Sequence, residues 1–177
     1  EIVKATFENS KEDFFVKTKA AFYLLNFAAE KEEYRQYFQK ELLKEKYQWI
    51  LTAISDFKLS EGMELLKTTL KDCPPQRKAS ILQTLGNFAE KAHSATEILL
   101  YYIDAKNELI SYQSTLALLK VDPLNSMLAR ALKKQMLGRY ASQMLLEKNI
   151  PLAATAVLEK VKAEAQTIVE LEISSGL

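Results

Sequence analysis

The sequence is poor in residues that build turns, disulfides and metal sites. It holds one cysteine, one histidine, four glycines and four prolines among 177 residues. The single cysteine, Cys73, excludes an internal disulfide and is typical of a reducing compartment, so we expect a cytoplasmic protein. Because turn-forming residues are scarce while Leu, Ala, Glu, Lys and Gln are abundant, the composition favours helices over strands.

Signals for catalysis and for cofactors are missing as well. No glycine-rich phosphate loop, nucleophile elbow or His-Glu-x-x-His motif occurs. Glu90 and His93 have the Glu-x-x-His spacing of di-iron bundles, but such sites need that pair twice and His93 is the only histidine. We therefore predict no catalytic, cofactor-binding or metal-binding residues, and a protein that is not an enzyme.

Long apolar runs and a strong net charge are also absent. The longest apolar runs, 20–25 and 98–103, are far shorter than the roughly 20 residues that span a bilayer, so no membrane span is expected. A net charge of +1 creates no overall field that would favour nucleic acid or an anionic membrane.

The stretch 78–89 resembles the stretch 130–141, and this similarity is the main positive signal in the sequence. The matching pairs are Lys78/Arg130, Ala79/Ala131, Gln83/Gln135, Leu85/Leu137, Gly86/Gly138, Phe88/Tyr140 and Ala89/Ala141. Glycine inside a helix costs roughly 1 kcal/mol relative to alanine, so two glycines at one slot suggest close contact with a neighbouring helix. We interpret the pair as a duplicated helical unit in which Gly86 and Gly138 are equivalent.

Hydrophobic spacing predicts an all-α chain of seven or eight antiparallel helices in one domain, 1–177. An aromatic-rich N-terminal helix pair would occupy 1–58, a helical-repeat region 59–172, and a frayed tail 173–177. The stretch 95–121 is compatible with one helix or with two, and we favour a break near Lys106 and Asn107, because hairpin repeats use shorter helices.

The Leu85-Gly86-x-Phe88 and Leu137-Gly138-x-Tyr140 segments resemble the Leu-Gly-x-x-Tyr core of tetratricopeptide-type repeats, with the aromatic one residue early. HEAT or armadillo-like units are similar in kind and closer in length to the period near 52 residues. The resemblance covers about 60–171. It implies a right-handed α-α superhelix that presents a surface to a partner.

The leading functional hypothesis is a non-enzymatic scaffold or adaptor that binds a protein or peptide partner. The segment around the second copy is locally basic, which suits an acidic peptide better than a nucleic-acid backbone. Glutamates of the last helix could instead pair with that segment. The residues predicted to bind the partner are Asn87, Arg130, Lys134, Arg139 and Tyr140.

Two alternatives remain open. Twelve of the seventeen aromatic residues lie at or before Phe57, which fits a bulky helix–helix core or an aromatic-lined pocket for a small molecule, as in a regulator's effector domain. The heptad-like seam 98–119, or the last helix, could instead pair across a homodimer.

Overall fold

The computed structural model describes residues 1–57, 60–146, 150 and 152–175, and these residues contain helices but no strand. The all-α prediction is therefore confirmed for the part of the chain that is described. There are eleven α-helices among these residues, more than the seven or eight predicted. The elements are α1 (Ile2–Glu8), α2 (Phe14–Phe27), α3 (Glu32–Leu42), α4 (Tyr47–Phe57), α5 (Ser60–Thr69), α6 (Pro75–Asn87), the 3-10 helix η1 (Ala89–Ala95), α7 (Thr96–Tyr102), α8 (Glu108–Val121), α9 (Leu128–Met136), α10 (Ala141–Leu146) and α11 (Leu152–Ser175).

Three helices are additional to the eight. Helix α1 precedes the first helix expected from the sequence. The stretch 32–57, interpreted from the sequence as one helix, divides into α3 and α4, because its middle, 43–46, is exposed and has no apolar side chain that packs into the core. The stretch after Pro123, also interpreted as one helix, divides into α9 and α10. At the C-terminus, α11 continues to Ser175, so the predicted frayed tail is helical over 173–175.

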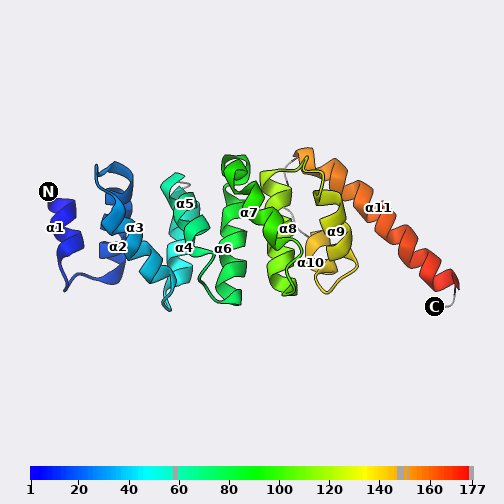
Figure 1. The fold of residues 1–177 in the computed structure, drawn as a ribbon, viewed down its shortest axis with the longest axis horizontal. Helices are drawn as coiled ribbons and strands as arrows, with labels where there is room; N and C mark the ends of the chain where they lie inside the picture. Colours follow the sequence, from blue (N-terminus) through cyan, green and yellow to red (C-terminus); the bar gives the residue numbers. More distant parts are fainter. Residues whose placement is uncertain (58–59, 147–149, 151, 176–177) are drawn as a thin grey trace. The chain divides into compact units, whose positions relative to one another are not determined.

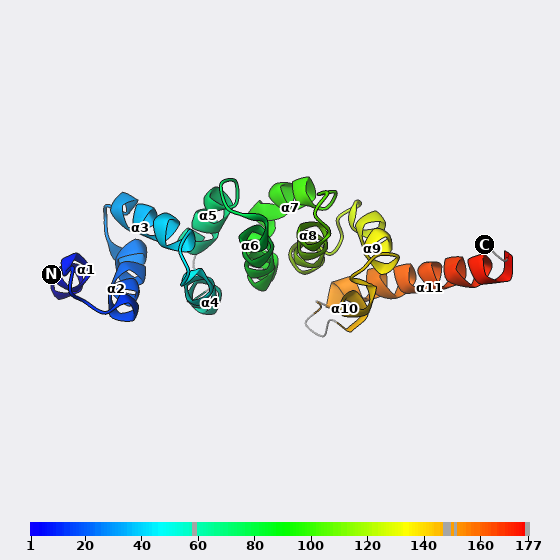
Figure 2. The ribbon, with the colours of Figure 1, turned by 90° about the horizontal axis from the view of Figure 1, so that it is seen from below.

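The chain forms two compact units, residues Glu1–Cys73 and Pro74–Leu177. They meet at Cys73-Pro74-Pro75, where proline disfavours helix in the residue before it and then occupies the first position of α6. The sequence placed its regional boundary at 58/59, which lies outside the described residues. In Figure 2, α2 and α4 of the first unit lie in one row and α3 and α5 in another. In the second unit, α6 and α8 lie in one row and α7 lies in the other.

Aromatic side chains form the core of the first unit. Phe22 on α2 packs on Phe38 of α3, with ring centroids 4.4 Å apart. Phe7 of α1 lies edge-on to Tyr34 and Tyr37, at 5.1 and 5.2 Å. Burial raises the pKa of the Tyr37 hydroxyl, although its hydrogen bond to Thr18 acts in the opposite direction. The aromatic residues thus join the first three helices.

An ion network joins α3 to α5 in the same unit. Arg35 Nη2 and Lys31 Nζ each lie 2.9 Å from a different carboxylate oxygen of Glu61, which is 22% exposed. The hydrogen bonds from Arg35 and Lys31 hold the pKa of the Glu61 carboxyl below its ordinary value, and Glu61 in turn raises the pKa of Arg35. The network therefore stabilises this unit while Glu61 is ionised.

Helix α8 is the centre of the second unit and is buried along most of its length, between α6, η1, α7 and α9. Figure 1 shows α6 and α8 side by side. A Cβ atom added to Gly86 of α6 would lie 3.0 Å from the Cα and 3.1 Å from the Cβ of Ala117 on α8. The predicted close contact at Gly86 is confirmed, because only a residue without a side chain allows the helices to approach this far.

The stretch 95–121 forms two helices, as we favoured. Asn107 caps α8 by accepting a hydrogen bond from the backbone N–H of Ile110, 3.2 Å away. Two α8 hydroxyls then bind carbonyl groups of the α7 region: Ser114 Oγ donates to Leu99 O at 2.6 Å, and Ser111 Oγ donates to Ile103 O. The break is thus stabilised, because α8 supplies the donors that the end of α7 lacks.

Gly138 does not match Gly86, so the predicted equivalence of the two glycines is wrong. Gly138 lies in an exposed turn after α9, and a Cβ there would approach only the backbone oxygens of Lys134 and Gln135, at 3.3 and 3.6 Å. Leu85 is fully buried, whereas its counterpart Leu137 is 51% exposed. The physical reason is that α9 ends at Met136, so the matching residues fall in a turn.

The two glycines should respond differently to substitution by alanine. Gly86→Ala should lower the free energy of unfolding by about 1–2 kcal/mol, because α6 and α8 must separate to admit the methyl group. Gly138→Ala should change it by less than about 0.5 kcal/mol. Urea denaturation followed by circular dichroism measures both, and equal losses would contradict the packing described for α6 and α8.

The stability that is lost when the Glu61 carboxylate is removed should depend on pH. The pKa of Glu61 is lowered in the folded state, so its stabilisation is present above the unfolded value of about 4.5 and is lost as pH falls through the folded value. Glu61→Gln should therefore destabilise the first unit at about pH 7 and much less at about pH 3. Urea denaturation followed by Trp49 fluorescence tests this, and a pH-independent difference would contradict it.

Candidate functional site

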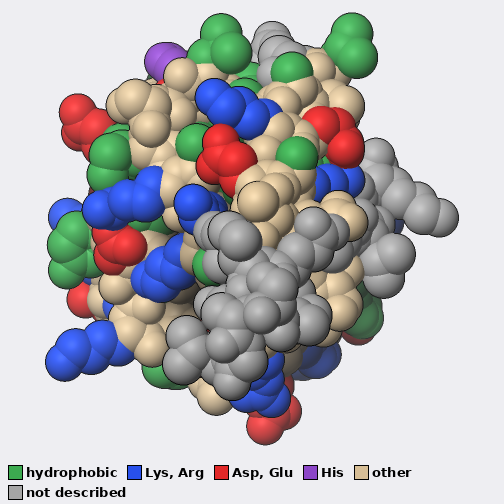
Figure 3. Space-filling model, turned by 90° about the vertical axis from the view of Figure 1, so that its right-hand side faces the viewer, with side chains coloured by type: hydrophobic (Ala, Val, Ile, Leu, Met, Phe, Trp, Pro, Cys, Tyr) green, Lys and Arg blue, Asp and Glu red, His purple; other side chains and the backbone are tan. Residues whose placement is uncertain are grey.

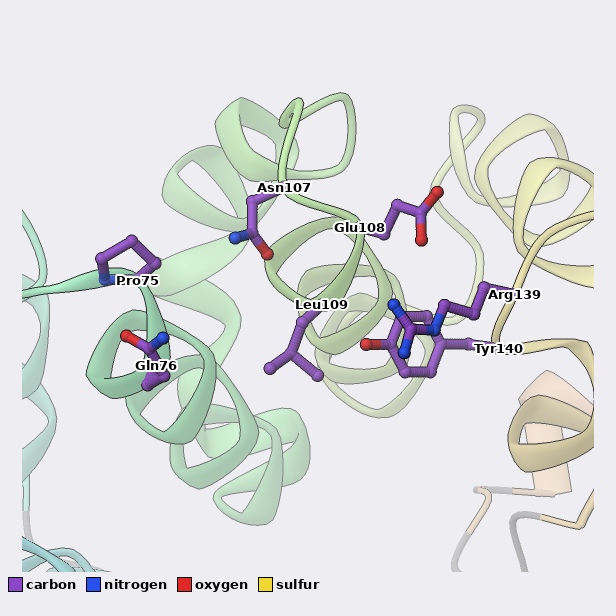
Figure 4. A pocket seen from close by; sticks show the side chains of 7 residues that line it. All are labelled: Pro75, Gln76, Asn107, Glu108, Leu109, Arg139 and Tyr140. Atoms are coloured by element: carbon purple, nitrogen blue, oxygen red, sulfur yellow. The ribbon is translucent and has the colours of Figure 1, made fainter.

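The second unit contains two adjoining pockets, with volumes of about 230 and 350 Å³, that share Glu108, Arg139 and Tyr140. We call them together the α8 groove. The residues that line it are Pro75, Gln76, Asp104, Ala105, Lys106, Asn107, Glu108, Leu109, Ser111, Lys134, Gln135, Gly138, Arg139 and Tyr140. Figure 4 shows the smaller pocket from close by.

Three separate segments supply the walls of the α8 groove. The first is the start of α6, with Pro75 and Gln76; the second is the start of α8; the third is the turn between α9 and α10. In Figure 4, Arg139 and Tyr140 extend from that turn toward Leu109, and Pro75 and Gln76 lie on the other side of Leu109. Helices α6 and α8 pack against each other, and their first turns lie next to each other at the surface. The groove lies where these first turns meet.

Buried contacts fix the floor of the groove. Tyr140 stacks on Tyr112 of α8, with ring centroids 4.7 Å apart and an interplanar angle of 17°. Gln135 Nε2 donates to Ser111 Oγ at 2.9 Å, and Ser111 donates in turn to Ile103 O. Ser111 and Gln135 are 1% and 5% exposed, so this chain of hydrogen bonds is shielded from water. The groove is therefore preformed.

Most of the predicted basic segment is paired within the unit. Arg130 and Lys134 both bind Asp104, the latter at 3.5 Å, and Lys133 Nζ lies 3.9 Å from Glu164 of α11. The contact between Lys133 and Glu164 is the pairing with the last helix that was an open alternative in the sequence analysis. All these groups are at least 42% exposed, so each pair contributes little stability.

Three charged residues of the groove remain without an ion-pair partner in the described part of the chain: Lys106, Glu108 and Arg139. On the face drawn in Figure 3, Lys and Arg are interspersed with Asp and Glu, in keeping with the net charge of +1. The charge that the groove can offer to a ligand is therefore local, and Arg139 is its best placed cation.

The structure brings together some of the five predicted partner-binding residues. Lys134, Arg139 and Tyr140 line the groove, and Arg130 is connected to it through Asp104. Asn87 is the last residue of α6, whereas the groove lies at the start of that helix, about 18 Å away along its axis. Asn87 is thus not part of the same site.

Sequence reasoning missed Gln76, Glu108 and Leu109, and it noted Asn107 only as a break between helices. A signal was present for the two helix starts that carry them, because proline at position 75 suits the first turn of a helix and the break near Asn107 implies that a helix begins there. That they lie beside each other depends on the α6–α8 contact, which is a tertiary feature.

The aromatic residues of the first unit serve mainly as core. A pocket of about 430 Å³ in this unit touches Phe14, but its other lining residues are the charged Glu41, Lys44, Glu45 and Lys46. Phe14 itself contacts Phe15 and Trp49, at 5.4 and 5.8 Å. This pocket therefore offers a small molecule only one aromatic wall.

Comparison of the chain with models of known protein families, with curated proteins and with solved structures finds no match. Within the described residues, no helix has both the length and the apolar character needed to cross a membrane. Over the same residues, no three His, Cys, Asp or Glu side chains converge in a way that could hold a metal ion.

The hydrogen-bonded floor should contribute to stability. Ser111→Ala removes the donor to Ile103 O and the acceptor for Gln135, so it should lower the free energy of unfolding by about 1–3 kcal/mol. Ser142→Ala, at an exposed position of α10, is the matched control and should change it by less than about 0.5 kcal/mol. Thermal and urea denaturation measure both, and a neutral Ser111→Ala would show that the groove has no rigid floor.

Proposed function

We propose that the chain is a non-enzymatic helical-repeat module for protein–protein interaction, a scaffold or adaptor that binds an extended segment of its partner in the α8 groove. The observation that carries this proposal is the set of polar side chains that face the preformed groove without partners among the described residues. Such groups are typical of a surface that gains its hydrogen bonds from a ligand.

Two amide side chains suit the backbone of a peptide. The oxygen of Asn107 is engaged in capping α8, which leaves its Nδ2 free to donate. The side chain of Gln76, on the opposite wall, makes no hydrogen bond within the described structure. An extended peptide exposes a carbonyl and an N–H at every residue, so these amides can bind it whatever its side chains are. Leu109 and Tyr140 add apolar surface between them.

The charges of the groove favour an acidic residue in that peptide. Lys106 and Arg139 together outweigh Glu108, and Asp104 is already bound to Arg130 and Lys134. A guanidinium group binds a carboxylate through two parallel hydrogen bonds, which gives both affinity and orientation. We therefore assign Arg139 as the residue that selects a carboxylate, with Tyr140 beside it.

The arrangement of helices supports a repeat array. Over α2–α5 in the first unit and α6–α8 in the second, successive helices alternate between two rows, as the helical hairpins of tetratricopeptide and HEAT repeats do (Figure 2). We propose that the hairpins continue as a right-handed α-α superhelix, in which the ends of successive helices form the binding edge. The non-matching Gly138 is compatible with this, because units of an array can differ in sequence while they keep the hairpin.

The chemistry of the groove supports a binding role rather than catalysis. Among the described residues, its lining includes no histidine or cysteine and one serine, Ser111, which is buried with its hydroxyl bound to Ile103 O. A nucleophile needs an adjacent base and an accessible hydroxyl, and Ser111 has neither here. A cytoplasmic location remains part of the proposal, supported by the presence of a single cysteine, Cys73, in the sequence.

Selection from a random library of peptides of about ten residues, long enough to cross the groove when extended, tests the proposal. Binders to the full chain should carry Asp or Glu at a fixed position. Arg139→Glu should weaken the selected peptides at least about ten-fold, because it replaces attraction by repulsion. Fluorescence anisotropy with labelled peptides measures the affinities.

The matched control is Lys160→Glu, the same charge change at an exposed position of α11 outside the groove, which should alter affinity by less than about two-fold. A peptide in which the selected acid is replaced by Lys should bind better to Arg139→Glu than to the unaltered chain. Failure to select any binder, or equal weakening by the two variants, would contradict a partner site in the groove.

A further inference from the structure

Helix α2 exposes an apolar stripe along its whole length. Phe15, Val16, Tyr23 and Phe27 are 41%, 44%, 53% and 74% exposed. These positions, together with Lys19, recur at intervals close to four residues and so lie on one face of the helix. The rings of Tyr23 and Phe27 are in contact, with centroids 4.8 Å apart, which makes the end of the stripe one continuous aromatic surface.

Apart from Phe15, which contacts Trp49 of α4, the stripe lies away from the helices that pack against α2 in this unit. Thr18 and Phe22 face α3, where they contact Tyr37 and Phe38. Lys17 lies over the ring of Phe7 on α1, 5.2 Å from its centroid. At 100° per residue, the faces that carry these contacts are distinct from the face that carries Tyr23. The stripe is therefore a free surface of the unit.

The exposed apolar area of the stripe is comparable to that of a functional patch. The exposed fractions of the four side chains correspond to roughly 400 Å² in total. The largest apolar patch on a typical monomer measures about 300–600 Å² and is often functional. The stripe extends about 18 Å from Phe15 to Phe27, the length of a three-turn helix contact.

Lysines lie on and beside the stripe, although Glu41 and Glu45 share a pocket with Lys46. Helix α2 contains Lys17 and Lys19 and no acidic residue. Lys46 Nζ lies 5.5 Å from the ring centroid of Phe15, at the beginning of the stripe. Lys19 and Lys46 have no ion-pair partner in the described part of the chain, and the nearby Asp13 is occupied as the N-cap of α2, where it accepts a hydrogen bond from Phe15 N.

From these observations we infer that the stripe on α2 is a second docking surface, separate from the α8 groove, and that it takes an amphipathic helix whose apolar stripe is flanked by acidic residues. A straight row of side chains fits the ridges and grooves of another helix. Acidic residues of that helix pair with Lys46 at the beginning of the stripe and with Lys19 within it. A second copy of the same helix is a poorer occupant, because antiparallel α2–α2 pairing would bring two Lys19 side chains into the centre of the contact.

Trp49 provides a built-in reporter for this docking. It is the only tryptophan of the chain, and its ring lies 4.9 Å from Phe15. We would titrate the full chain with a designed helical peptide of about 18 residues that has leucine on one face and glutamate on both flanks. Trp49 emission should change and saturate. The same peptide with lysine in place of glutamate should bind at least about ten-fold more weakly.

The variant that tests the site is the double substitution Tyr23→Ser and Phe27→Ser. Both side chains are exposed, so the helical circular dichroism should be unchanged, while affinity for the glutamate peptide should fall at least about ten-fold. Tyr101→Ser, at a residue that is 78% exposed on α7, is the matched control and should leave affinity within about two-fold. Arg139→Glu should also leave it unchanged, which separates this surface from the proposed groove.

Several outcomes would overturn the inference. Undiminished binding by the double variant would show that the peptide does not dock on the stripe. Equal binding of the lysine peptide would show that the surface does not select acidic residues. Sedimentation that shows a dimer of the unaltered chain, lost in the double variant, would assign the stripe to a second copy. Co-flotation with phosphatidylserine vesicles that depends on Tyr23 and Phe27, without binding of the glutamate peptide, would assign it to a membrane surface.

Discussion

The close contact of Gly86 on α6 with Ala117 on α8 determines how the second unit is built. A glycine inside a helix costs roughly 1 kcal/mol, and the burial of α8 between α6 and its other neighbours offsets that cost. With the two helices in contact, the first turn of each lies next to that of the other. The α8 groove is formed there, so its position follows from the packing of the core.

The polar groups of the second unit fall into two sets, and this division explains the character of the site. One set is satisfied internally: Ser111 and Ser114 bind the carbonyl groups near the end of α7, and Gln135 binds Ser111. The other set, which includes Gln76, Glu108 and Arg139, faces the groove and has no partner in the described structure. The first set makes the site rigid, and the second supplies the hydrogen-bonding and charged groups that can bind a ligand.

Local features were predictable from the sequence, and features that depend on tertiary packing were predictable only in part. Composition was enough for the all-α class, and the shorter helices of hairpin repeats were the reason for expecting the break between α7 and α8, which the structure has. The close contact at Gly86 was also foreseen. Gly138 was not placed correctly, since the same Leu-Gly-x-aromatic pattern can occupy a buried helix or an exposed turn. The pattern alone does not reveal that α9 ends at Met136.

The residues of the candidate site were likewise predictable only in part, because the site depends on tertiary packing. Lys134, Arg139 and Tyr140 were chosen for charge and aromatic character, and they do meet in one groove. Asn87 was chosen as part of the repeated stretch, yet it lies at the far end of α6. Gln76 and Leu109 come from helix starts that are 33 residues apart in sequence, so their proximity could not be inferred without the α6–α8 contact. Periodicity identifies which residues share a helix face, but not which helix ends meet.

The most direct measurement of the central claim, that the α8 groove holds an extended acidic segment of a partner, is chemical-shift mapping by NMR of the isotope-labelled chain with a selected acidic peptide. The account predicts that the largest backbone shifts fall at 75–76, 107–109 and 138–140, with little change at Asn87 or on α2. Shifts concentrated around Asn87, on α2, or spread evenly over both units would contradict it.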